Sequence, residues 1–156
     1  MYADSQLTSP AMAGRWPAAR ARRQFVLGVI LAASVVSTAA HYTHNFVEIE
    51  QYPQYDWQSA ALTQAAILVS WPLLTAIGLI GYWLYRQRRD RAAHTCLVIY
   101  SLTGLITPIH FLKGSPDIAP LWYATIFTDA LAGLAVLAFV GWSALTFVRV
   151  EPGVPT

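Results

Sequence analysis

The chain has 156 residues, enough for one domain, and 56% of them are hydrophobic while only 12% are charged. A soluble domain carries about 25% charged residues because its surface must face water. The low charge therefore excludes an ordinary soluble domain and predicts a surface that largely faces lipid. The formal net charge of +2 does not indicate a nucleic-acid-binding protein. A single cysteine, Cys96, excludes an intramolecular disulfide or a cysteine zinc site.

Four apolar segments follow a polar N-terminal stretch, and each is predicted to be a membrane-spanning α-helix. An α-helix needs roughly 20 residues to cross about 30 Å of hydrocarbon, and unpaired backbone amides are too costly there for another structure. Short links between the segments favour antiparallel neighbours. The predicted fold class is therefore all-α, an integral membrane four-helix up-and-down transmembrane bundle. Its parts are a disordered cytoplasmic tail at 1–23, helices at 24–46, 59–85, 92–112 and 121–148, and a cytoplasmic tail at 149–156.

The distribution of arginines predicts how the bundle is oriented. Arginines precede the first segment and fill the link between the second and third, whereas the link at 47–58 contains Glu48, Glu50 and Asp56 without Lys or Arg. Positively charged links stay on the cytoplasmic side. We therefore expect both termini in the cytoplasm and a location in a bacterial inner membrane. The arginines are Arg15, Arg20, Arg22 and Arg23 before the first segment and Arg86, Arg88, Arg89 and Arg91 in the second link.

The first segment has one alternative interpretation. Residues 21–27 resemble a twin-arginine export signal, and residues 37–40 resemble a small-residue cleavage site. Cleavage after Ala40 would make His41 the new N-terminus, and an N-terminal histidine can bind copper. The competing interpretation, a first transmembrane helix with ordinary flanking arginines, agrees better with the three further spans.

Polar side chains from all four predicted helices lie at one depth near the outer surface. Asp129 is the strongest candidate for a functional residue, because a carboxylate inside a membrane is costly unless it is paired or protonated. His41 lies at a similar depth, measured from the other end of its helix. The predicted ligand-binding residues are His41, Asn45, Gln64, Thr107, His110 and Asp129.

Three roles for this layer stay open at the sequence level. Asp129 can accept a hydrogen bond from His41 or His110 and only fix helix packing. The layer can form a pocket in which Asp129 and a histidine share a proton or hold a polar ligand group. It can also bind a divalent transition metal, and the metal ligands would then be His41, His44, His110 and Asp129.

Two further patterns predict structure rather than chemistry. Small residues at Gly78, Gly81 and Gly133 predict close helix–helix contacts. Aromatic residues predict a belt at the outer interface, consisting of Tyr52, Tyr55, Trp57, Trp122 and Tyr123.

The leading functional hypothesis is a multi-pass membrane protein that binds a small molecule or a lipid in the polar layer. One alternative is a non-catalytic accessory subunit of a larger membrane complex, with other membrane proteins as partners. A further alternative is a membrane metalloenzyme that uses the histidines and Asp129 as metal ligands or as acid and base.

Overall fold

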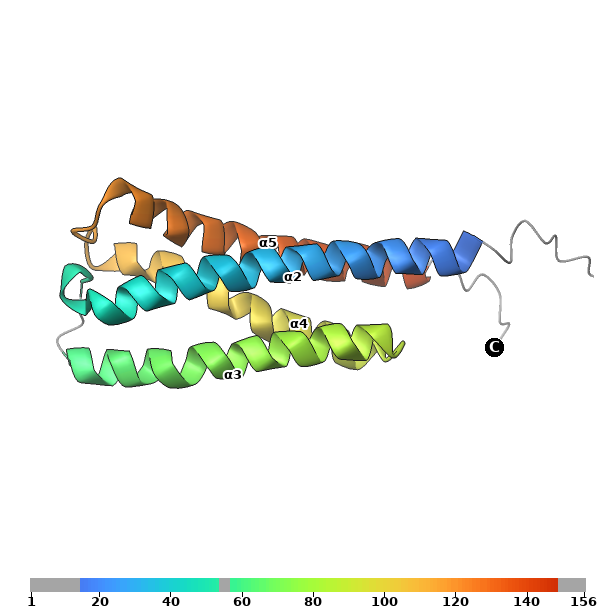
Figure 1. Cartoon of the computed structure of the whole chain (residues 1–156), viewed down its shortest axis with the longest axis horizontal. Coiled ribbons are helices and arrows are strands. Elements are labelled where there is room, and N and C mark those ends of the chain that lie inside the picture. The colour runs from blue at the N-terminus through green and yellow to red at the C-terminus, as the bar shows by residue number, and fades with distance from the viewer. Residues whose placement is uncertain (1–14, 54–56, 149–156) are drawn as a thin grey trace, which may run out of the picture.

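The fold, known from a computed structural model, is described for residues 15–53 and 57–148 and for the side chains of residues 18–53 and 57–146 (Figure 1). Apart from the links between helices, these residues are helical, and they contain no strand. The helices are α2 (Arg15–Val47), α3 (Ala60–Arg86), α4 (Asp90–Leu105) and α5 (Pro120–Val148), with short 3-10 helices η1 (Ile49–Gln51) and η2 (Thr107–Leu112).

Four segments of this fold are long and apolar enough to cross a membrane, which confirms the four predicted apolar helices. They are Ala18–Val47, Ala60–Arg86, Asp90–Leu112 and Pro120–Thr146. The third combines α4 with η2, so its last turns are wound more tightly than an α-helix. Residues 1–14 and 149–156 of the predicted tails, and Tyr55 and Asp56, lie outside the described residues.

The first helix is longer than the sequence predicted. Residues 15–23 were expected to be disordered, but α2 begins at Arg15. The reason is a contact with the start of α4. The Arg20 guanidinium pairs with Asp90 at 2.9 Å, donates to the Tyr85 carbonyl and lies 4.6 Å from the centre of the Tyr85 ring. Arg20, which the sequence presents only as a charge flanking the first helix, therefore links α2 to α3 and α4.

The links between the helices lie at the two ends of the bundle (Figure 1). The loop end contains the links 48–59 and 113–119, while the arginine end contains the link 87–89 and the start of α2. At the arginine end, Ser143 shares its hydroxyl between the Tyr85 hydroxyl and His94 Nε2, each at 3.2 Å. This contact joins the start of α4 to the end of α5 and was not expected from the sequence.

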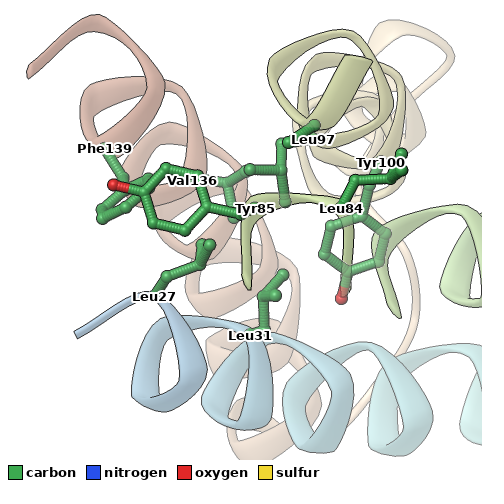
Figure 2. Close-up of a cluster of buried hydrophobic side chains, with 9 residues drawn as sticks. Leu27, Leu31, Leu84, Tyr85, Leu97, Tyr100, Val136 and Phe139 are labelled. Carbon is green, nitrogen blue, oxygen red and sulfur yellow. The ribbon is translucent and has the colours of Figure 1, made fainter. Parts of the chain in front are cut away.

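The main hydrophobic core lies toward the arginine end. Figure 2 shows side chains from all four helices pointing toward one another there. Each helix contributes two of the labelled side chains. Transfer of apolar surface from water into such a core is favourable by about 25 cal/mol per Å². The labelled residues are Leu27, Leu31, Leu84, Tyr85, Leu97, Tyr100, Val136 and Phe139.

Glycines bring α4 into backbone contact with α5. A Cβ atom on Gly104 would lie 2.0 Å from the carbonyl oxygen of Asp129, and one on Gly133 would lie 2.7 Å from that of Ser101. On the other side of α4, a Cβ on Gly78 of α3 would lie 2.7 Å from the Tyr100 ring. The predicted close contacts at Gly78 and Gly133 are confirmed, while Gly104, the tightest of these glycines, was missed.

We predict that Gly104→Ala destabilises the bundle by at least about 1–3 kcal/mol, the usual cost of forcing extra volume into a packed interface. The obstacle is a backbone oxygen, which cannot rotate away. Gly141→Ala is the matched control, since a Cβ there meets no atom within 4 Å. Unfolding of the two variants in a denaturing detergent checks this, and equal stabilities would contradict the role of Gly104.

Candidate functional site

Helices α2 and α5 face each other through a ladder of polar contacts. The two helices are antiparallel, and the contacts recur every three or four residues on both, which is one helical turn. We call these residues the α2–α5 ladder. Its steps are the His44 ring stacked on Trp122 at 4.0 Å, His41 Nδ1 with Thr125 Oγ1 at 3.3 Å, and Ser37 Oγ with Asp129 Oδ1 at 2.5 Å.

His41 is buried in the middle of this ladder, with 1% of its surface exposed. Three rings surround it, with centroids 5.5 Å away for Tyr42, 6.1 Å for Tyr52 and 5.5 Å for His110. Its Nδ1 contacts Thr125, but its Nε2 is buried without a hydrogen-bond partner. A buried polar atom without a partner costs about 1–3 kcal/mol of stability, so the packing around the His41 ring has to offset that cost.

Tyr52 closes the loop end above the histidines. It was predicted to belong to an interfacial belt, but it is only 2% exposed. Burial raises the pKa of the Tyr52 phenol to about 12, so the hydroxyl keeps its proton, and it forms a hydrogen bond with His44 Nδ1 at 2.8 Å. Its ring also lies 4.9 Å from that of His110. No sequence pattern distinguishes such a tyrosine from an interfacial one.

Asn45 and His110 form a second polar pair at the loop end. Asn45 Nδ2 lies 3.2 Å from His110 Nε2, and this contact joins α2 to η2. Asn45 is buried, and its Oδ1 atom has no hydrogen-bond partner. The fold therefore brings together the predicted site residues Asn45 and His110 and leaves the Asn45 Oδ1 acceptor without a partner.

Asp129 is fully buried, but its partner is not a histidine. Ser37 donates to Asp129 Oδ1 and also contacts Thr128 Oγ1 at 2.8 Å, while Asp129 Oδ2 has no hydrogen-bond partner. The expected bond from His41 or His110 is therefore wrong. The register of the ladder places His41 opposite Thr125, one turn closer to the loop end than Asp129.

Gln64 and Thr107 bond to backbone atoms instead of lining a pocket. Gln64 Nε2 donates to the Phe46 carbonyl at 2.9 Å, and Thr107 Oγ1 donates to the Gly104 and Ile126 carbonyls at 2.7 and 3.1 Å. These bonds join neighbouring helices. Both residues are at the predicted depth, but their roles in the structure are in packing.

The predicted metal site is not formed. Among the described residues, no three His, Cys, Asp or Glu side chains are placed to hold one metal ion. His44 is directed to Tyr52, His110 to Asn45 and Asp129 to Ser37. The predicted ligands therefore make separate contacts and do not converge on one point. These ligands are His41, His44, His110 and Asp129.

A pocket of about 230 Å³ opens at the loop end between α2, α3 and η2. Of the predicted site residues, Asn45 and His110 line it, and His41, Gln64 and Asp129 do not. The sequence did not predict the remaining lining, because the pocket is built by links that contact one another only in the folded chain. The lining residues are Asn45, Pro53, Trp57, Gln58, Thr63, Ile109, His110 and Lys113.

An apolar groove of about 190 Å³ lies along α2 and α3 at the same end of the bundle. On α3 its lining starts at Ile67, one helical turn beyond the pocket residue Thr63, and on α2 it includes Phe46, which follows the pocket residue Asn45. Comparisons of the chain with protein-family models, with curated proteins and with solved structures found no match.

We predict that His44 and Tyr52 are energetically coupled. In a double-mutant cycle with His44→Ala and Tyr52→Phe, the coupling should be about 0.5–1.5 kcal/mol, as for one hydrogen bond. As a control, His44→Ala and Tyr123→Phe should be additive, because the Tyr123 hydroxyl donates to the Pro116 carbonyl instead. Detergent unfolding measures both cycles, and additivity in the first would show that Tyr52 does not hold His44.

Proposed function

We propose that this protein is a multi-pass membrane protein that binds an amphiphile with an anionic, hydroxyl-bearing head group and a hydrocarbon chain. The observation that carries this proposal is the pocket at the loop end, with Asn45, His110 and Lys113 in its lining, together with an apolar groove that starts one turn further along α3. A polar site beside an apolar one matches the two parts of such a molecule.

The chemistry of the pocket favours an anionic head group. Lys113 brings a positive charge to the pocket, and Gln58 brings a side chain that can donate hydrogen bonds. Asn45 also lines the pocket, and a turn of its amide would offer the Oδ1 acceptor, which is buried without a partner, to a hydroxyl of the head group. A glycerol phosphate head group combines both features, whereas a choline head group carries a positive charge of its own.

The dimensions of the groove favour one hydrocarbon chain. From Ile67 to Pro72, the groove lining on α3 rises about 8 Å at ~1.5 Å per residue. This is about a quarter of the ~30 Å hydrocarbon thickness of a bilayer, which accommodates the first part of one chain. Aromatic and aliphatic side chains line the groove, among them Phe46, Ile67 and Trp71.

We test the proposal with a single-chain phosphoglycerol lipid and a phosphocholine lipid of the same chain length. The protein in detergent should bind the phosphoglycerol lipid at least about tenfold more tightly, which corresponds to about 1.4 kcal/mol. Brominated chains should quench tryptophan fluorescence, because Trp71 lines the groove and Trp57 the pocket. Equal affinity for the two lipids would contradict an anionic head-group site.

Matched variants locate the bound molecule. Lys113→Gln should abolish the preference for phosphoglycerol, whereas Arg91→Gln removes the same charge at the arginine end and should leave it unchanged. If both variants weaken binding equally, the preference reflects total charge and the pocket is not the site. Co-purification of a second chain in place of lipid binding would favour the accessory-subunit alternative.

We also propose that both termini lie in the cytoplasm of a bacterial inner membrane. Support comes from the arginines at the link 87–89, which share the arginine end with the start of α2, and from Glu48 and Glu50 at the loop end. In this orientation the pocket opens toward the outer leaflet.

We predict the labelling pattern of single cysteines introduced into a Cys96→Ala background. With an impermeant maleimide, Ser115→Cys at the loop end should react in intact cells, and Gln87→Cys at the arginine end should react only after permeabilisation. Both positions are exposed, so burial does not explain a difference. The reverse pattern would invert the proposed orientation without affecting the pocket.

A further inference from the structure

Asp129 is a buried acid that the proposed pocket does not use. Of the described acidic side chains it alone is fully buried, and the ion pair found among the described residues joins Arg20 to Asp90 at the arginine end. An unpaired carboxylate in an apolar interior is costly enough that the group takes up a proton instead. The free Oδ2 atom is where that proton would reside, since Oδ1 accepts from Ser37.

The groups that face Asp129 are mostly hydroxyls. From α2 these are Ser37 and the Tyr42 phenol, which donates to the Thr103 carbonyl; from α4 comes the Tyr100 phenol, which donates to Ser34. Thr128 on α5 completes the set. The charged residue of α3, Arg86, lies at the arginine end. No described cation therefore neutralises a charge on Asp129.

The two directions from Asp129 along the α2–α5 interface differ sharply. Toward the loop end, the next turn holds Thr125 and His41, whose Nε2 atom has no partner. Toward the arginine end, the hydroxyl pair of Ser34 and Tyr100 is followed by an apolar layer with buried side chains of Leu31 and Val136. Protons move between groups that can both donate and accept, which hydroxyls and imidazoles do and aliphatic side chains do not.

We propose that Asp129 is a reversible intramembrane proton-binding site that is loaded from the loop end by way of His41 and Thr125. A proton from water at the loop end reaches the imidazole and passes to Thr125. The Thr125 hydroxyl, which donates to the Trp122 carbonyl, then has to rotate toward the Ser37–Thr128 hydroxyl pair, from which the proton reaches the Asp129 carboxylate. Release follows the same path in reverse, and the layer at Leu31 and Val136 closes the opposite direction. This inference does not depend on amphiphile binding and extends the function to proton uptake.

Infrared difference spectroscopy of the full chain in phosphatidylcholine nanodiscs tests the site. Acidification should produce a carbonyl band of a protonated carboxylic acid that is absent from Asp129→Asn. Asp90→Asn, which makes the same change at the ion-paired acid of the arginine end, should keep the band. A band that does not change with pH, or that survives in Asp129→Asn, would overturn the proposal.

The route is tested by the rate at which the band shifts on transfer into D₂O. His41→Leu should slow this exchange at least about tenfold, which corresponds to about 1.4 kcal/mol in the barrier. Thr125→Val, which keeps the side-chain size, should also slow it and serves where His41→Leu fails to fold. Ser143→Ala removes a buried hydroxyl at the arginine end and should leave the rate unchanged. Equal rates in all variants would overturn the route through the loop end.

Discussion

The backbone contact between α4 and α5 is the constraint on which the rest of the bundle depends. At Gly104 and Gly133 the two helices are so close that no side chain fits between them. Such a contact fixes the axial position of α5 to within the size of a methyl group, because sliding either helix would bring a Cβ atom against a backbone oxygen. The main chain of Asp129 lies at this contact, so the depth of its carboxyl is fixed as well.

With α5 fixed, the α2–α5 ladder determines the register of α2. Ser37 meets Asp129, and the histidines of α2 then fall at successive turns toward the loop end. Tyr52 in the following link is brought above them and forms a hydrogen bond with His44. The contact between α4 and α5 thus helps to position the residues that line the pocket, because hydrogen bonds join each of these elements to the next.

The two halves of the bundle differ in what they bury. The arginine half contains the hydrophobic core and the ion pair between Arg20 and Asp90. Three of the five described polar atoms that are buried without partners belong to His41, Asn45 and Asp129, and the other two to Arg20 and Thr75. Each of these atoms costs free energy. The apolar half offsets the cost of the polar half.

The sequence by itself determined the class of the protein, because four apolar segments of spanning length have few alternatives in which every backbone amide is paired. It also identified the level at which polar groups gather, including His41, Asn45, His110 and Asp129. It did not determine which of them meet. A helical wheel gives depth and face, but the rotation and sliding of one helix against another depend on packing at residues such as Gly104. Only the tertiary structure decided that Asp129 pairs with Ser37 and that Asn45 and His110 share a pocket with Lys113.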